Sequence, residues 1–283
     1  MKRKICSCLI ILSLLLSSLV SVVSAAGTPE IVILFESDVH CSVDGYAKIA
    51  ALKDEISNQA EYVGLVTSGD FVQGGSLGVV SKGEYIVNIM NLIGYDAVAL
   101  GNHEFDYKTE RLHELVNKLD ATVVCSNYKK ADEDVAVFDP YTIVSYGDVD
   151  IAYIGITTPD TITSSSPAQF KNENGEYIYS FSGDELYETV QKSVDDAKKE
   201  GADYIIALSH LGTENVFQEW SAQALIKNTT GLDAVLDGHS HSVVEGLVVS
   251  DKAGENVVVA STGTAFANIG KLTISNGEIK TEQ

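Results

Sequence analysis

The chain has 283 residues, of which 45% are apolar and 21% are charged, with 23 glycines and only 4 prolines. These proportions are close to globular averages, and they exclude collagen, a coiled coil and wholesale disorder. Forty Asp and Glu residues against 19 Lys and Arg give a formal net charge of −21. This negative net charge repels other anions, so it disfavours binding to a nucleic-acid backbone or to an anionic membrane surface.

The first 26 residues have the layout of a secretory signal peptide. Lys2, Arg3 and Lys4 precede an uncharged apolar stretch that ends in small residues around Ala25 and Ala26. An uncleaved membrane anchor is the alternative, but the serines and the small-residue exit favour cleavage. We therefore expect export without stable membrane insertion, and an exported chain from residue 27 with a net charge of about −24.

From residue 27 to 283 the sequence predicts one α/β domain, because apolar runs alternate with helical patterns and no linker or internal repeat interrupts them. We expect helices at 45–57, 84–92, 109–119 and 184–200. We expect strands at 31–35, 62–67, 97–100, 122–125, 142–145, 151–156, 204–208, 234–236, 257–260 and 271–274. The polar stretch 161–179 is predicted to be a surface excursion.

Polar side chains with an affinity for metals follow five of these strands. They are Asp38 and His40, Asp70, Asn102 with His103, His210, and His239 with His241. Ligand crevices of open α/β sheets lie outside the carboxyl ends of the strands, where these residues fall. On extended backbone, the two members of the Asp38–His40 and His239–His241 pairs would each project to one side.

The positions of the histidines in the sequence favour a shared metal site over a chance distribution. Five of the six histidines follow predicted strands, and only His113 lies inside a predicted helix, where we expect a solvated side chain. A lone DxH or GD would be a turn with a solvated carboxylate. Imidazole and carboxylate together suit Zn, Fe or Mn better than Ca or Mg, and seven candidate ligands suit two ions that share one carboxylate.

The order of the motifs DxH, GD, GNHEFD, SHLG and GHSH resembles that of the calcineurin-like metallophosphoesterases, above all the 5′-nucleotidase and UDP-sugar hydrolase family. The resemblance covers essentially the whole chain after residue 26, and it implies a four-layer α/β/β/α sandwich. It also implies a hydrolase of phosphoric esters with two divalent ions, Zn, Mn, Fe or Co.

Carried over position by position, the resemblance assigns a role to nine residues. Asp38, His40 and His241 would hold one ion, Asn102, His210 and His239 the other, and Asp70 would bridge them. His103 would be the catalytic histidine and Asp106 the carboxylate that orients it. Glu104 is expected to be a supporting carboxylate.

The function implied is hydrolysis of nucleotide monoesters by a metal-activated water, with a small phosphoester as substrate. Alternatives are a phosphodiesterase for 2′,3′-cyclic nucleotides or UDP-sugars that needs a missing C-terminal substrate-binding domain, and a weak or inactive metal-binding surface module. The intact His103–Asp106 pair argues against the inactive module.

Two departures from the family pattern stand out. Cys41 replaces the usual glycine after DxH, which would place a thiol at the rim of the site, and a disulfide with Cys125 is open if the Cα atoms come within about 7 Å. Arg111, the one arginine after residue 26, lies in a predicted helix away from the motifs. The ions would therefore supply most of the positive charge that phosphate recognition needs.

Overall fold

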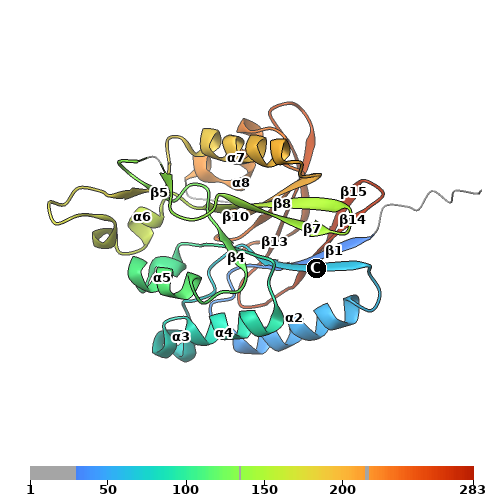
Figure 1. Cartoon of the computed structure of the whole chain (residues 1–283), viewed down its shortest axis with the longest axis horizontal. Coiled ribbons are helices and arrows are strands. Elements are labelled where there is room, and N and C mark those ends of the chain that lie inside the picture. The colour runs from blue at the N-terminus through green and yellow to red at the C-terminus, as the bar shows by residue number, and fades with distance from the viewer. Residues whose placement is uncertain (1–29, 134, 214–216) are drawn as a thin grey trace, which may run out of the picture.

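Two six-stranded sheets lie face to face at the centre of the molecule (Figure 1). The structure is a computed structural model, and it describes residues 30–133, 135–213 and 217–283. The predicted signal peptide at 1–26 lies outside these residues. No helix in the described part of the chain has both the length and the apolar character needed to cross a membrane.

The first sheet has the order β15-β14-β1-β2-β3-β4, and β1 to β4 run parallel. Its strands are β1 (Ile31–Glu36), β2 (Tyr62–Thr67), β3 (Ala97–Ala99), β4 (Thr122–Val124), β14 (Gly270–Ser275) and β15 (Glu278–Glu282).

The second sheet has the order β12-β13-β11-β10-β8-β7, with a parallel centre and antiparallel edges. It consists of β7 (Tyr141–Tyr146), β8 (Val149–Thr157), β10 (Tyr204–His210), β11 (Ala234–Asp237), β12 (Val243–Ser250) and β13 (Asn256–Thr262). A small third sheet contains β5 (Lys129–Lys130), β6 (Val135–Ala136) and β9 (Tyr179–Ser180).

Helices cover the outer face of each large sheet, which gives the expected four layers (Figure 1). The first sheet is covered by α2 (Val43–Ile56), α3 (Gly75–Ser81), α4 (Glu84–Ile93) and α5 (Thr109–Val116). The second is covered by α7 (Leu186–Glu200) and α8 (Ala222–Asn228). Shorter turns are α6 (Thr161–Ser164), η1 (His103–Phe105), η2 (Pro167–Phe170) and η3 (Gln218–Trp220).

A single apolar layer joins the two sheets. It contains side chains from both, among them Ile33, Val66, Tyr153, Ile206 and Leu236, all of them fully buried. Because each central strand is buried on both faces, it reads as a continuous apolar run in the sequence. One shared core between the sheets means that the described residues fold as one domain.

The two sheets approach each other closely near the end of β8, at Gly155. A Cβ atom on Gly155 would lie 1.9 Å from the carbonyl oxygen of Val124 at the end of β4. Only glycine permits this approach. It brings the carboxyl ends of the two sheets together, and these ends bear the predicted ligands.

Most predicted elements are confirmed to within two or three residues, but the excursion at 161–179 is only partly on the surface. Thr161 and Phe170 are fully buried, and Phe170 packs against Phe105 and Phe181 with ring centroids 5.7 and 5.5 Å apart. The segment supplies part of an aromatic core that its polar composition does not reveal. The pattern also missed α3, α6, α8, β12 and β15.

We expect Gly155→Ala to destabilise the protein by roughly 3 kcal/mol, since the methyl group would have to separate two packed sheets. Gly254→Ala is the control, because Gly254 lies in a turn with φ 91° and no atom close to the added methyl group. This substitution should lower the free energy of unfolding by roughly 1 kcal/mol, through the left-handed backbone alone. Urea denaturation measures both. Equal losses would contradict the close approach.

Candidate metal centre

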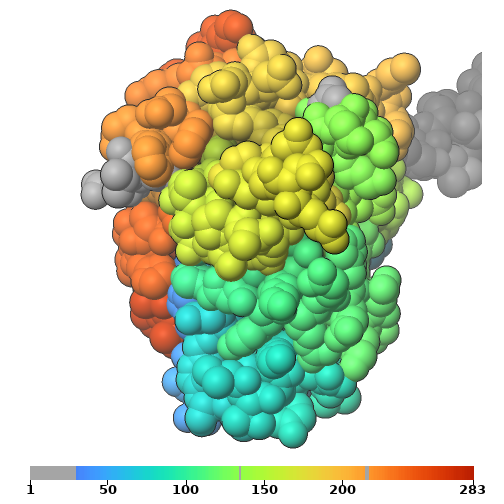
Figure 2. All heavy atoms as spheres, turned by 90° about the vertical axis from the view of Figure 1, so that its left-hand side faces the viewer, coloured from blue at the N-terminus to red at the C-terminus, as the bar shows by residue number. Residues whose placement is uncertain are grey.

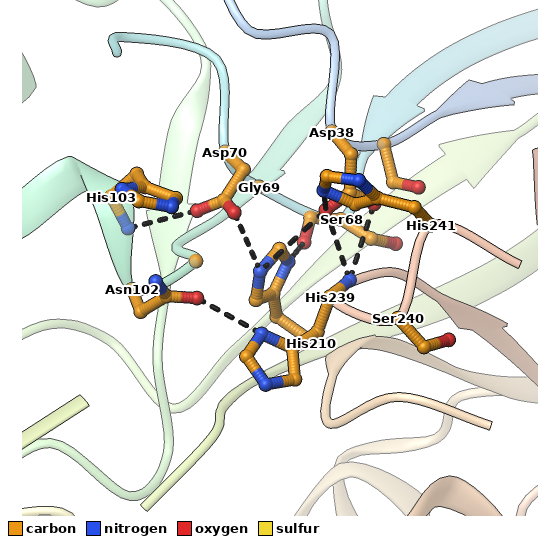
Figure 3. A network of polar contacts seen from close by, with 12 residues as sticks. Asp38, Ser68, Gly69, Asp70, Asn102, His103, His210, His239, Ser240 and His241 are labelled. Carbon is orange, nitrogen blue, oxygen red and sulfur yellow. Dashed lines mark hydrogen bonds and ion pairs between the residues drawn. The ribbon is translucent and has the colours of Figure 1, made fainter. Parts of the chain in front are cut away.

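The seven predicted ligands lie at the carboxyl ends of five strands, contributed by both sheets. Figure 3 labels six of them, all but His40, around one centre. The loops after β1, β2 and β3 carry Asp38, His40, Asp70 and Asn102. The second sheet contributes His210 at the end of β10, and His239 and His241 after β11. Two groups of three lie close enough to share an ion, each with its ligand atoms within 4.8 Å of one another: Asp38, His40 and His241, and Asp38, Asp70 and His210.

The first group surrounds the imidazole of His40. Its Nδ1 lies 3.2 Å from the carbonyl oxygen of Gln73, to which it can donate a hydrogen bond. Its Nε2 is then left as an acceptor and lies 3.1 Å from Nε2 of His241. Nε2 of His241 lies 3.5 Å from Oδ1 of Asp38. These nitrogen and carboxylate atoms face one another as the donors around a divalent cation do.

The second group is deeply buried around His210, whose side chain is not exposed at all. Its Nδ1 lies 2.8 Å from the carbonyl oxygen of Ser68 and donates to it. Nε2 lies 3.1 Å from Oδ2 of Asp70 and 3.9 Å from Oδ1 of Asp38, but it makes no aligned hydrogen bond. A buried nitrogen without a hydrogen-bond partner, aimed at two carboxylates, fits the donor set of a divalent cation.

Asn102 and His239 complete the site beside this second group. Oδ1 of Asn102 lies 3.0 Å from Nδ1 of His239. Burial, together with the charge of His210, lowers the pKa of His239 to about 4. The imidazole is therefore neutral at physiological pH, which is the form that binds metals.

Two nearly inaccessible carboxylates dominate the electrostatics. Burial raises the pKa of Asp38, with Asp70 adding to the effect and His210 opposing it. Burial would also raise the pKa of Asp70, but the positive charge of His210 lowers it below its usual range. In this arrangement His210 is the charge that neutralises the pair, since burial would lower its pKa but Asp70 and Asp38 raise it to about 10.

The extended-backbone argument for the DxH and HxH pairs is wrong. Asp38, His40, Asp70, His239 and His241 all have left-handed backbone, with φ between 45° and 75°. Non-glycine residues avoid this region, and such strain concentrates at functional sites. The strands end in tight turns, which send His239 towards Asn102 and His241 towards His40.

Glu104 explains how the turn after β2 is held. It is buried, and its carboxylate accepts hydrogen bonds from the backbone N–H groups of Asp70, Phe71 and Gly101 at 2.7 Å and of Val72 at 3.1 Å. The expected supporting role is thus visible as four N–H donors on one side chain. They fix Asp70 relative to Asn102.

His103 and Asp106 form a close pair at the edge of the site. Nδ1 of His103 lies 2.6 Å from Oδ2 of Asp106, and the backbone N–H of His103 donates to Oδ1 of Asp70 at 2.9 Å. The hydrogen bond with Asp106 raises the pKa of His103 to about 9 although partial burial opposes it. With Nδ1 engaged, Nε2 is the nitrogen left to act on a substrate.

Three expectations for residues around the site are corrected by the structure. Cys41 and Cys125 are both free and buried, and the Cys41 thiol points away from the rim and donates to the carbonyl oxygens of Phe71 and Val72. Cys41 and Cys125 therefore do not form a disulfide here.

The third correction concerns His113. This residue is not solvated but half-buried, with its ring 5.3 Å from that of Phe138.

A family model described as calcineurin-like phosphoesterase matches residues 31–243. The chain belongs to this family, which confirms the resemblance. It is 29% identical to the trifunctional nucleotide phosphoesterase YfkN of Bacillus subtilis over 83% of its own length and 18% of the relative's. It is also 29% identical to bovine 5′-nucleotidase over 77% of its own length and 39% of that protein.

The solved structures agree with the fold. The 5′-nucleotidase precursor of Thermus thermophilus superposes with a TM-score of 0.76 at 26% identity, over 89% of this chain and 54% of that one. The YfkN phosphoesterase structure superposes with a TM-score of 0.70 at 25% identity, over 90% and 89% of the two chains. The four-layer metallophosphatase fold is thus confirmed. The chain spans less than half the length of the full-length YfkN protein and of bovine 5′-nucleotidase.

We expect Glu104→Gln to lower the free energy of unfolding by roughly 2–3 kcal/mol, because the amide nitrogen cannot accept from the buried N–H groups. The variant should also bind Mn²⁺ more weakly, since Asp70 would lose its backbone support. Glu110→Gln, at an exposed position of α5, should change neither denaturation nor metal titration. An unchanged Glu104→Gln protein would contradict the role of this carboxylate.

In the metal-free protein, Asp106→Asn should lower the pKa of His103 from about 9 towards its ordinary value, as measured by NMR of the imidazole. Because the folded-state pKa is raised, the stability that this pair contributes should be complete below the unfolded-state pKa of about 6.5. It should disappear as the pH rises through about 9. The exposed Asp148→Asn serves as control. A pKa that Asp106→Asn leaves unchanged would refute the pairing.

Proposed function

We propose that this chain is an exported phosphomonoesterase with a dinuclear metal centre, acting on nucleotides in the manner of a 5′-nucleotidase. One observation carries the proposal: seven candidate ligand side chains from two sheets lie together beside the His103–Asp106 pair, and Figure 3 shows six of them with His103. A phosphoesterase needs an acid beside the metals to protonate the leaving group, whereas a metal-binding surface module does not.

The ligand set divides between the two ions. Asp38, His40 and His241 would hold the first ion. Asn102, His210 and His239 would hold the second, and Asp70 would lie between them as the bridge. The contacts of His40 with His241 at 3.1 Å and of Asn102 with His239 at 3.0 Å support this division. His, Asp and Asn donors suit Zn, Mn, Fe or Co, and availability decides among these ions.

The ions would polarise the phosphoryl oxygens and lower the pKa of water for an in-line displacement. His103 contributes the proton for the leaving oxygen. Asp106 holds Nδ1, which keeps the ring protonated and directs Nε2–H towards the substrate. General acid catalysis of this kind contributes typically 10²–10⁴-fold in rate.

The charge available to the phosphate supports a metal-centred mechanism. Arg111, the one arginine in the described residues, is held by Glu84 at 2.9 Å and Glu114 at 2.8 Å, on α4 and α5. It contacts the carbonyl oxygens of Ser81 and Lys82 as well. Arginine forks therefore play no part in holding the phosphate on this part of the chain.

The substrate class rests on the relatives. The names of several are 5′-nucleotidase, and one from Haemophilus influenzae is a 2′,3′-cyclic-nucleotide 2′-phosphodiesterase/3′-nucleotidase. A nucleotide monoester is the first candidate, and a cyclic phosphodiester is the second. Export, to the medium, the periplasm or the cell surface, rests on the layout of residues 1–26, and detection of the processed chain outside the cytoplasm would test it.

Purified protein with Mn²⁺ or Zn²⁺ should hydrolyse p-nitrophenyl phosphate, and a chelator should abolish the activity. His103→Ala should reduce kcat by roughly 10²–10⁴-fold while both ions stay bound, because the histidine is not a ligand. His113→Ala, in α5, is the matched control and should retain the activity.

Metal-loaded protein without activity on any aryl phosphate, nucleotide or cyclic nucleotide would overturn the proposal and favour a metal-binding surface module. A preference for AMP over p-nitrophenyl phosphate would indicate that part of the protein recognises the nucleoside. Equal turnover of the two substrates would instead indicate a general phosphoesterase.

A further inference from the structure

His239 has a polar partner on each side of its ring. Nδ1 lies 3.0 Å from Asn102 Oδ1, and Nε2 lies 3.9 Å from Oδ2 of Asp160. Asp160 belongs to no motif in the sequence. It lies three residues after β8, at the start of α6. Only one ring nitrogen of a neutral imidazole carries a proton, so its two partners decide the tautomer together.

Asp160 is held where it can act on that ring. Its Oδ1 accepts a hydrogen bond from Oγ1 of the buried Thr158 at 2.7 Å, and its carbonyl oxygen accepts from the N–H groups of Thr163 and Ser164 at 2.8 Å. Its side chain is 17% exposed. The anchored Oδ1 leaves Oδ2 as the oxygen that faces His239.

We propose that Asp160 is a positioning residue that keeps the proton of His239 on Nε2 and thereby presents the Nδ1 lone pair to the second metal ion. A carboxylate behind a ligating histidine fixes its tautomer and orientation and raises its basicity. The inference rests on the proposed dinuclear centre and adds to it a residue outside the seven ligands. Asp160 faces the ring edge opposite Asn102, so it acts through His239 and not as a ligand.

The segment from Thr158 to Gln169, which contains Asp160, also contacts the His103–Asp106 pair. Ser165 Oγ lies 3.5 Å from Oδ1 of Asp106, and Nε2 of Gln169 donates to Ser165 Oγ at 3.1 Å and to the carbonyl oxygen of Phe105 at 3.0 Å. In Figure 2 the segment is the yellow region between the blue-green and orange parts of this face. One segment thus supports both the second ion and the catalytic pair.

The test is a calorimetric titration of the metal-free full chain with Mn²⁺, comparing Asp160→Ala with wild type. The second ion should bind about 10–100-fold more weakly in the variant, whereas the first ion should bind as before. Asp148→Asn removes a carboxylate from the exposed turn between β7 and β8, and it should bind both ions like wild type. It controls for the change in net charge.

A second readout needs no metal. Nitrogen-15 NMR of the metal-free protein should show a larger share of the Nδ1–H tautomer of His239 in Asp160→Ala than in wild type, because the Asn102 oxygen beside Nδ1 would then be the one acceptor left of the two. The melting temperature should change little, because the backbone N–H groups of Thr163 and Ser164 bond to the carbonyl oxygen of Asp160, which the substitution leaves in place.

Two results would overturn the inference. One is unchanged binding of both ions in Asp160→Ala; the other is equal weakening of both ions with a lower melting temperature, which would make Asp160 a fold residue. Wild-type protein that binds fewer than two ions would instead contradict the proposed centre itself, and that failure is visible before any variant is made.

Discussion

The structure depends on two carboxylates that are removed from water beside each other. Asp38 is fully buried and Asp70 nearly so, and both face His210 within 4.8 Å. Buried like charges are costly unless a cation compensates them. His210 supplies one positive charge in the metal-free chain, and divalent ions would supply more. The rest of the site is arranged to keep these two groups together.

The backbone maintains the arrangement at a conformational cost. The turns after β1, β2 and β11 hold their ligand residues in left-handed conformations. Hydrogen bonds compensate: Asp38 N–H donates to the Gly69 carbonyl at 2.9 Å, and His239 N–H donates to Asp38 Oδ1 at 3.0 Å. The second of these bonds joins the loop after β11 in the second sheet to the loop after β1 in the first sheet, so the geometry of the site depends on the close approach of the two sheets.

The sequence predicted the strands and helices from their periodicity, and it predicted the seven side chains from their position after strands. The four layers followed from the family resemblance. The sequence could not predict the turns. Glycine in a sequence often indicates left-handed backbone, but Asp38 and His241 have this backbone without being glycine. The sequence also missed what depends on contacts between distant segments: the inward Cys41 thiol, the buried Phe170, and Asp160 behind His239. Those residues carry no motif, and only the fold brings them to the site.

The central claim is that these residues hold two ions with Asp70 between them. Anomalous diffraction from crystals grown with Mn²⁺ or Zn²⁺ tests it most directly. The account predicts two peaks about 3.5–4 Å apart, one on each side of the Asp70 carboxylate. A single peak, or peaks remote from Asp38, His210 and His241, would contradict it.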